Sequence, residues 1–174
     1  MSGPGARAWR LALALCGLVV LLDQATKAIV ERGMTLHESI PLLPFFSLTY
    51  VRNTGAAFGL LSELPPGLRL PLFVIVTIGA VWALVSYLRQ LRLEESWVAV
   101  ALGGILGGAA GNLVCRLRYG EVVDFLHLHY RGFDWPMFNV ADSAITIGVA
   151  LVLLHSLRAA DQTKTEERPA TEGR

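Results

Sequence analysis

Four apolar segments constrain this chain more than any other feature of its sequence. Each has about 15 to 20 residues, close to the ~20 that a helix needs to cross roughly 30 Å of hydrocarbon. Helices are expected because lipid offers no hydrogen-bond partner to an unpaired backbone group. The sequence therefore predicts an all-α membrane protein with four transmembrane helices. The segments run from Leu11 to Val30, from Leu70 to Leu88, from Trp97 to Leu113 and from Ser143 to Leu157.

The composition agrees with insertion into a membrane. Hydrophobic residues make up 53% of the 174 residues and charged residues only 17%, below the roughly 25% that is usual in soluble domains. A net charge of +1 gives no reason to expect nucleic acid as a partner. Cys16 and Cys115 fall near opposite ends of separate apolar segments, so they predict no disulfide framework.

The first apolar segment has some features of a cleaved signal peptide. Arg7 and Arg10 precede it, as basic residues do in secretory signals. However, Leu15 is bulky where a cleavage site needs a small residue, and the apolar run continues past Cys16. We therefore expect the segment to remain as a helix.

Basic residues near the ends of the segments predict the orientation. Four spans place both termini and the middle loop on one side, and the positive-inside rule makes that side the cytoplasm. Residues 158–174 are polar and charged, so we expect a disordered cytoplasmic tail after a single domain of residues 1–157. The basic residues on the predicted inner side are Arg7, Arg10, Arg89, Arg92, Arg158, Lys164 and Arg168.

The two predicted outer loops contain strand-like stretches. Phe46 to Arg52 is rich in β-forming residues. Leu126 to Tyr130, followed by Arg131-Gly132 and Phe133, is typical of a hairpin with a glycine turn. We expect these strands to form a small extracytoplasmic β-sheet. The loops themselves run from Glu31 to Arg69 and from Val114 to Ala141.

Glycines repeat at four-residue spacing in the third apolar segment, at Gly103, Gly107 and Gly111. Small residues at this spacing let two helices pack closely in lipid. The repeat predicts a helix-packing face, and it brings Asn112 close to a neighbouring helix.

Polar residues gather near one face of the membrane. Asp23 lies roughly 18 Å along its helix from Leu11, and Asn112 roughly 22 Å from Trp97. Asp142 opens the fourth helix at the same face. Polar groups in a membrane are costly and indicate function. The remaining members, predicted to lie in the outer loops, are Asn53, Arg116, Asp124 and Asn139.

Two neighbouring carboxylates in this layer could serve a hydrolase, because like charges held close together share one proton. The ionised carboxylate can activate a water while the protonated one polarises a carbonyl. Structural roles compete with this interpretation. Asp142 could cap its helix, Asp23 could pair with Lys27 four residues on, and Arg116 could pair with Glu121 or a lipid phosphate. The asparagines could form turns or caps.

Two other functions are open to the residues alone. His127 and His129 share a strand face and could bind a metal with Asp124 in an outer-face metallohydrolase. An exposed strand face is favoured, because no third ligand has typical spacing. A small transporter or assembly factor would need polar residues in both leaflets, whereas the inner halves of the segments are almost purely apolar.

Five short blocks, in this order on four spans, resemble the signature of lipoprotein signal peptidases (signal peptidase II). The resemblance covers about Leu11 to Leu157. The blocks are Asp23-Gln24-Ala25-Thr26-Lys27, Val51-Arg52-Asn53-Thr54-Gly55-Ala56-Ala57-Phe58-Gly59, Gly107-Gly108-Ala109-Ala110-Gly111-Asn112-Leu113-Val114-Cys115-Arg116, Val123-Asp124-Phe125 and Phe138-Asn139-Val140-Ala141-Asp142-Ser143.

The resemblance implies an aspartyl endopeptidase of the bacterial inner membrane, a monomer without metal or cofactor. It would cut prolipoproteins just before the diacylglyceryl-modified cysteine and be inhibited by globomycin-type peptides. The catalytic pair maps onto Asp124 and Asp142. The residues that would line or brace the substrate site are Asp23, Asn53, Asn112, Arg116 and Asn139.

Cys115 is a departure from the family, which usually has an acidic residue before Arg116. A thiol in apolar surroundings is neutral, so any pairing made by that acid is missing here. We also expect the loop with Phe58, Leu60 and Leu61 to cover the site as a lid, because Gly55 and Gly59 flank it.

Overall fold

Four long helices dominate the computed structural model, which describes residues 4–55, 61, 63–90 and 96–166. Each contains a stretch that is long and apolar enough to cross a membrane. The predicted four-span architecture is therefore confirmed. The helices are α1 (Pro4–Gly33), α2 (Pro66–Leu88), α3 (Ser96–Tyr119) and α4 (Val140–Glu166).

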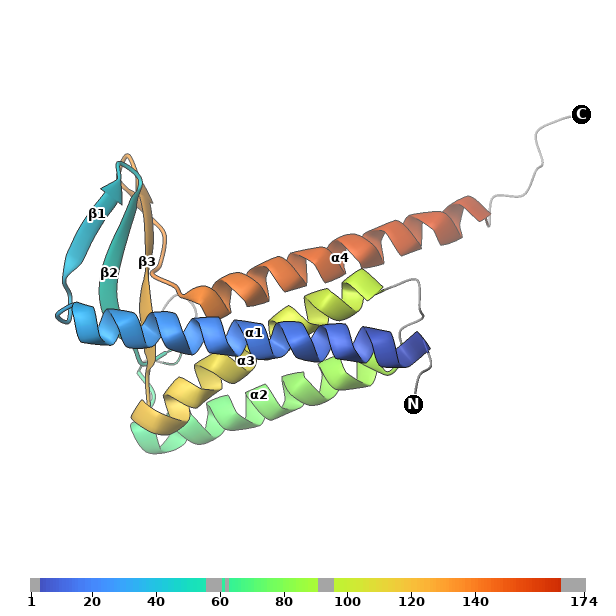
Figure 1. Ribbon diagram of the computed structural model, residues 1–174, viewed down its shortest axis with the longest axis horizontal. Coiled ribbons are helices and arrows are strands. Elements are labelled where there is room, and N and C mark those ends of the chain that lie inside the picture. Colours follow the sequence, from blue (N-terminus) through green and yellow to red (C-terminus); the bar gives the residue numbers. More distant parts are fainter. Residues whose placement is uncertain (1–3, 56–60, 62, 91–95, 167–174) are drawn as a thin grey trace, which may run out of the picture.

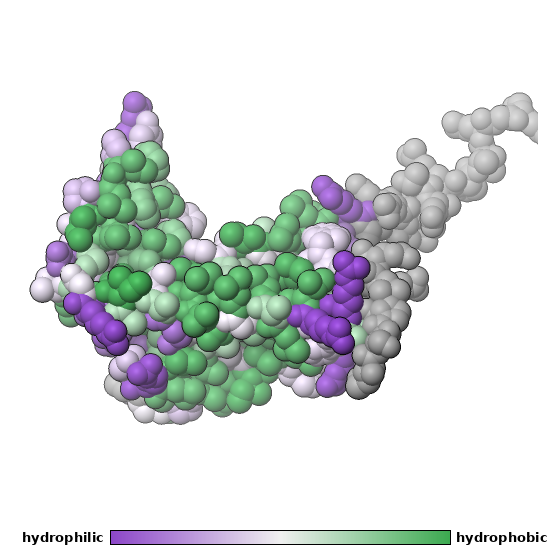
Figure 2. Space-filling model, viewed as in Figure 1, coloured by the Kyte–Doolittle hydropathy of each residue, from purple (hydrophilic) through white to green (hydrophobic). Residues whose placement is uncertain are grey.

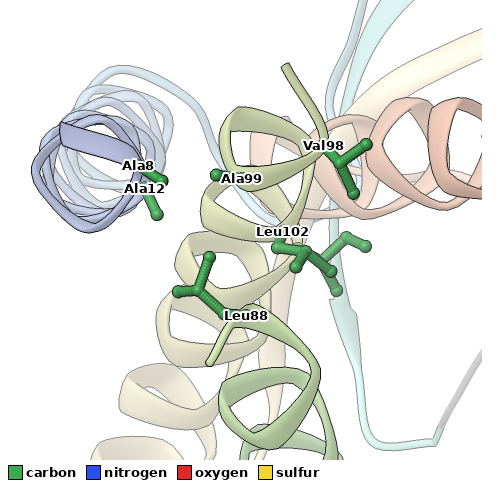
Figure 3. Packing of buried hydrophobic residues seen from close by; sticks show 7 residues of the cluster. Ala8, Ala12, Leu88, Val98, Ala99 and Leu102 are labelled. Atoms are coloured by element: carbon green, nitrogen blue, oxygen red, sulfur yellow. The ribbon is translucent and has the colours of Figure 1, made fainter. Parts of the chain in front are cut away.

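Helix α3 lies at the centre of the bundle and packs against each of the other three (Figure 1). Most residues of its most apolar stretch are buried, whereas most side chains of α2 are at least partly exposed, with Phe73 and Leu88 as buried exceptions. Small side chains of α1 and larger ones of α2 and α3 meet in one apolar cluster (Figure 3). The labelled members of this cluster are Ala8, Ala12, Leu88, Val98, Ala99 and Leu102.

The outer surface of the bundle is apolar. Leu21, Ile75 and Trp82 are all more than half exposed. Figure 2 shows hydrophobic side chains over the middle of the helices and hydrophilic ones towards the two ends. Large apolar residues that point outward suit contact with lipid, where they cost no free energy.

The glycine repeat of α3 forms a packing face, as predicted. A Cβ atom on Gly107 would lie 2.7 Å from the backbone oxygen of Cys16 in α1. Gly108, on an adjacent face, would collide with the backbone oxygen of Ala141 in α4. Close packing of α3 between α1 and α4 therefore requires glycine at both positions.

A small antiparallel sheet forms from the two loops, which confirms the predicted sheet. Its strands lie in the order β1 (Ser39–Leu43), β2 (Phe46–Asn53), β3 (Val122–Tyr130) and β4 (Phe133–Asp134). Arg131 and Gly132, with φ angles of 47° and 85°, make the hairpin turn between β3 and β4. The prediction missed β1, because Pro41 lies within it and proline is tolerated only at a sheet edge.

The sheet stands at the end of the bundle where α1 ends and α4 begins (Figure 1). Val30 of α1 packs with Tyr50 of β2 and with Val123 and Phe125 of β3 in a second apolar cluster. This cluster fixes β3 to the bundle, so that the strand passes close to the start of α4. The first turns of α1 and the last turns of α4 lie at the opposite end (Figure 1).

The helices extend beyond the predicted apolar spans, which corrects two expectations. Helix α3 continues to Tyr119, so Arg116 lies in its last turn and not in a loop. It stops at Gly120, whose φ of 76° and N–H bond to the Arg116 carbonyl form a helix C-cap. Helix α4 continues to Glu166, where a disordered tail was predicted. Residues 158–166 contain no glycine or proline and several helix formers.

Candidate functional site

The start of α4 carries two of the predicted site residues. The Asp142 N–H donates to Asn139 Oδ1 over 3.0 Å, and the Asn139 N–H donates to Asp142 Oδ2 over 3.2 Å. Such reciprocal bonds between the cap residue and the third residue stabilise a helix start. Asn139, and not Asp142, is therefore the N-cap, which corrects the alternative role considered for Asp142. The other carboxylate oxygen of Asp142 remains available to the site.

Asp124 lies on β3 and is only 1% exposed. Asn53 Nδ2, at the end of the paired strand β2, donates to Asp124 Oδ2 over 2.8 Å. Asn139 Nδ2 donates to Asp124 Oδ1 over 2.7 Å. Both carboxylate oxygens are thus held by amide donors, one from the sheet and one from the start of α4.

Asn112 of α3 completes the link between the two acids. Its Nδ2 donates to Asp142 Oδ1 over 2.7 Å, while its Oδ1 accepts a hydrogen bond of 3.2 Å from Asn139 Nδ2. Asn139 therefore contacts Asp124 through its side chain and Asp142 through its backbone. The structure brings together five of the predicted residues: Asn53, Asn112, Asp124, Asn139 and Asp142.

The environment of Asp124 favours its protonated form. Its pKa is raised from 3.8 to about 6: burial is the largest cause, the charge of Asp142 adds to it, and the hydrogen bonds from Asn53 and Asn139 act in the opposite direction. Because the two carboxyl groups interact, they titrate as a pair. Such a pair can hold one proton near neutral pH, as the sequence analysis required of a hydrolytic site.

A cavity of about 930 Å³ lies against both aspartates. Asn53, Asn112 and Arg116 line its polar part. The start of α4 and the segment before it form an apolar wall of the cavity. The sequence did not predict this wall, because sequence alone does not show which apolar residues face a cavity. Its members are Trp135, Pro136, Met137, Phe138, Ile145 and Ile147.

Arg116 faces this cavity from the last turn of α3. Its Nη2 donates to the Gly55 carbonyl over 2.9 Å, and its guanidinium lies 4.1 Å from the ring centre of Phe73. Nε is buried without a hydrogen-bond partner among the described residues. Arg52, and not Arg116, pairs with Glu121, over 3.4 Å, so that alternative for Arg116 is wrong.

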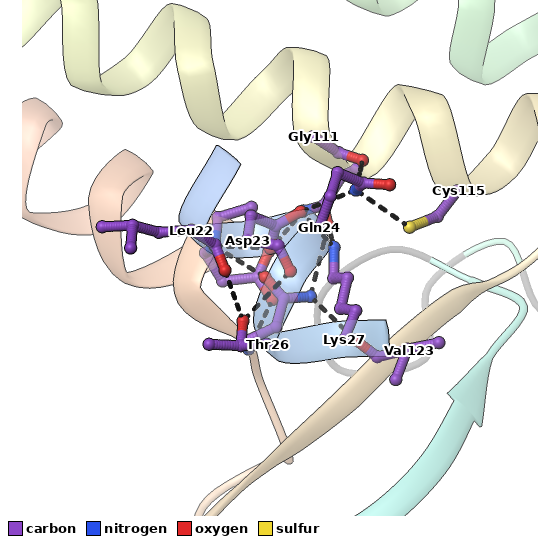
Figure 4. Close-up of polar contacts among 12 residues, drawn as sticks. Leu22, Asp23, Gln24, Thr26, Lys27, Gly111, Cys115 and Val123 are labelled. Carbon is purple, nitrogen blue, oxygen red and sulfur yellow. Dashed lines mark hydrogen bonds and ion pairs between the residues drawn. The ribbon is translucent and has the colours of Figure 1, made fainter. Parts of the chain in front are cut away.

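Asp23 lies behind the aspartate pair and is fully buried. The predicted pairing with Lys27 is confirmed, with Nζ 2.8 Å from Asp23 Oδ2 (Figure 4). Asp23 Oδ1 accepts the N–H of Ala141 over 3.0 Å, at the start of α4. Asp23 thus braces the helix that carries Asp142. Lys27 also donates to Asn112 Oδ1 over 2.8 Å, a contact that the sequence analysis missed.

His127 and His129 lie on the sheet, apart from the carboxylate pair. His127 Nε2 is 3.1 Å from Asp134 Oδ1, and His129 Nε2 is 2.9 Å from Ser47 Oγ. Alternation along β3 directs Asp124 to the opposite face from the histidines. Within residues 4–166, apart from the gaps given above, no three His, Cys, Asp or Glu side chains are arranged to hold a metal ion.

Cys115 is buried in α3, with its Sγ 3.5 Å from Gln24 Nε2 (Figure 4). A second cavity, of about 260 Å³, borders this thiol together with Lys27 and Arg118. A carboxylate at position 115 would therefore find donors and cations nearby. Of the predicted lid, Phe58, Gly59 and Leu60 lie outside the described residues.

Known proteins resemble this chain over most of its length. The family model described as Signal peptidase (SPase) II matches residues 15–158. The lipoprotein signal peptidase of Syntrophotalea carbinolica is 48% identical over 151 residues, which are 86% of this chain and 92% of the relative. That of Aquifex aeolicus is 45% identical over 147 residues, 84% of this chain and 85% of the relative. A solved bacterial membrane enzyme, 34% identical, covers 94% of both chains with a TM-score of 0.78.

Proposed function

This chain belongs to the signal peptidase II family, and we propose that it removes signal peptides from prolipoproteins with Asp124 and Asp142 as its catalytic pair. One observation carries the assignment of the pair. Two carboxylates, one from β3 and one from α4, border one cavity, and Asn139 contacts both of them. The role matches the chemistry of an aspartyl endopeptidase, which needs two acids that share a proton.

The reaction follows from that shared proton. The ionised carboxylate takes a proton from a water molecule, whose oxygen then attacks the carbonyl carbon of the scissile peptide bond. The protonated carboxyl group donates its proton to the carbonyl oxygen. When the C–N bond breaks, the leaving nitrogen takes a proton from the pair. One hydroxyl group of the tetrahedral intermediate gives its proton back to the pair as the new C=O bond forms, so that the pair again holds one proton. Asn53, Asn112 and Asn139 hold the carboxylates in place throughout.

The substrate is a diacylglyceryl-modified prolipoprotein, cut just before the modified cysteine. The polar part of the cavity suits an extended peptide backbone, because asparagine amides and Arg116 offer hydrogen-bond donors. The apolar wall formed by Phe138, Ile145 and Ile147 suits the lipid portion. Among the described residues Arg116 Nε has no hydrogen-bond partner, and this supports a role of the guanidinium in holding the peptide.

The protein is a multi-pass membrane protein, and we place it in the bacterial cell membrane as a monomer. Residues 1–157 form its protease domain. Both termini lie in the cytoplasm and the site lies at the extracytoplasmic face, as the basic residues Arg7, Arg10 and Arg158 indicate. It needs no metal or cofactor and binds no nucleic acid.

The direct test is cleavage of a diacylglyceryl-modified prolipoprotein by the purified protein. Asp124→Asn and Asp142→Asn should each lower kcat by at least about 100-fold, because either change removes the shared proton. Asp134→Asn is the matched control, since its side chain is 69% exposed on the sheet, and should keep full activity. Full activity in either of the first two variants would rule out the pair.

Three further measurements test the substrate and the metallohydrolase alternative. The precursor without its diacylglyceryl group should be a poor substrate if the apolar wall binds lipid. A chelator should have no effect on cleavage, and His127→Ala should keep activity. Loss of activity in both of these experiments would favour the metallohydrolase.

A further inference from the structure

The buried ion pair behind the carboxylates has a part in catalysis. We propose that Lys27 is a positioning residue, which orients Asn112 against Asp142 and places a buried positive charge behind the catalytic pair. The inference rests on the proposed function, since it concerns the chemistry of Asp124 and Asp142. It extends that function to a residue of α1 that does not border the main cavity.

Lys27 is one of two donors that fix the orientation of Asn112, the other being Asn139 Nδ2, 3.2 Å from the same oxygen (Figure 4 shows the lysine). Lys27 is 2% exposed, and its Nζ lies 2.8 Å from Asn112 Oδ1. An ammonium group has only donors, so the amide oxygen must face Lys27. The amide nitrogen then faces Asp142 Oδ1, at 2.7 Å. If the amide were reversed, a donor would face Lys27 and an acceptor would face the carboxylate.

Stability alone does not account for this ion pair. A buried pair can often be replaced by apolar residues without loss of stability. Both members of this pair instead contact groups that hold Asp142. Asp23 binds the N–H of Ala141, the residue before Asp142, and Lys27 binds Asn112. The pair therefore connects α1 to the catalytic carboxylate by two routes.

The charge of Lys27 also acts on the aspartate pair. Burial is the main reason why the pKa of Asp124 is raised, and the positive charge of Lys27 acts in the opposite direction. Lys27 thus favours the form of the pair that has lost one proton. Since Lys27 is buried, water and salt screen its charge much less than that of an exposed residue.

Charged and titratable groups surround Lys27 from every element that packs against it. Arg32 and Arg118 are exposed, so solvent screens them more than Lys27. The groups are Asp23, Glu31 and Arg32 of α1, Cys115, Arg118 and Tyr119 of α3, Asp124 of β3 and Asp142 of α4.

The experiment is the pH dependence of kcat and KM on the lipidated precursor. Lys27→Gln keeps a hydrogen-bond donor but removes the charge. We expect kcat to fall about tenfold while KM stays within about twofold, because Lys27 does not touch the substrate. Both limbs of the pH profile should move to higher pH, by about half a unit, since the ionised forms of the pair lose a favourable charge.

Three companion variants complete the test. Lys27→Arg should restore the wild-type profile, because the cavity of about 260 Å³ beside the lysine has room for the larger group. Arg32→Gln removes an exposed cation from the same helix and should leave the profile in place. Asp23→Asn removes the negative charge beside Lys27 and should move both limbs of the pH profile to lower pH. This measurement tests the electrostatic effect even if Lys27→Gln fails to fold.

The outcomes separate this inference from the proposed function. Failure of the wild-type protein to cleave the precursor would overturn the function itself. A different result would leave the function intact but contradict this inference. If the wild type cleaves the precursor, and Lys27→Gln has the pH profile of the wild type and only a lower melting temperature, then Lys27 has a structural role alone. An unmoved profile in Asp23→Asn would contradict the electrostatic part in the same way.

Discussion

The two ends of the helix bundle contain opposite kinds of side chain. At the end away from the sheet, Ala12, Leu88 and Leu102 pack in a purely apolar cluster. At the sheet end, the same helices α1 and α3 carry a buried ion pair and Asn112, which reach towards two carboxylates. The apolar end depends on shape and packing, whereas the polar end depends on a network of hydrogen bonds between buried polar groups.

The two ends of the bundle therefore have different roles, one in stability and one in catalysis. Apolar packing holds the helices at fixed separations, and the glycines of α3 make those separations small. The polar end uses this rigidity to keep buried charges together at a cost in stability. Changes at the apolar end should therefore affect stability, and changes at the polar end should affect catalysis first.

The largest expected effect is at Asn139, which contacts both carboxylates. Asn139→Ala removes the donor to Asp124 and the cap of α4. Activity should fall by at least about 100-fold, and stability by about 1 kcal/mol. Asn139→Ser keeps a capping oxygen but lacks the amide donor, so it should recover stability without activity. Recovery of both in Asn139→Ser would show that the cap, and not the donor, matters for catalysis.

A core change at the other end should give the reverse pattern. Leu102 is fully buried between helices, so Leu102→Ala should cost about 3 kcal/mol. Thermal unfolding in detergent micelles measures the loss, and the pH profile of the enzyme that remains folded should stay unchanged. Leu13→Ala, at a residue that is 60% exposed, is the matched control. A shifted pH profile in Leu102→Ala would break the division between the two ends.

Asp124 should lower stability at neutral pH, because its buried carboxyl group has a pKa of about 6, raised from 3.8. The unfolded chain binds fewer protons than the folded one between these values, so stability falls as pH rises through this window. Asp124→Asn removes that dependence. The variant should gain roughly 2 kcal/mol on the wild type between pH 4 and pH 8. Melting temperatures at both pH values test this, and equal differences at the two would contradict it.

The smallest effect should come from Cys115, which the family resemblance described above marks as a departure. A carboxylate there would lie near Gln24 Nε2 and the small cavity bordered by Lys27 and Arg118. Cys115→Asp should therefore leave activity equal to the wild type or up to about twofold higher. Cys115→Ala serves as the control for loss of the thiol. A marked loss of activity in Cys115→Asp alone would show that the position rejects negative charge.

Much of the candidate site could be anticipated from the chain. Asp23, Asn112 and Asp142 stand out because polar residues are rare and costly in apolar segments. The Asp23–Lys27 pair could be read from its spacing along a helix. Arg116 could be found but was placed in a loop, because the apolar pattern ends at Leu113 while the helix continues to Tyr119. Hydropathy detects the lipid-facing part of a helix and not its hydrogen-bonded ends.

The sequence by itself determined the four spans, the sheet of two loops and the layer in which the polar residues lie. Burial in lipid and strand alternation leave patterns among residues that are close together in the chain, so these features can be predicted without the tertiary structure. Only the tertiary structure decided that Asn139 caps α4 while it contacts Asp124, and that Lys27 meets Asn112. These contacts join residues up to 85 positions apart. They depend on how closely α3 packs between α1 and α4, a separation that no local pattern encodes.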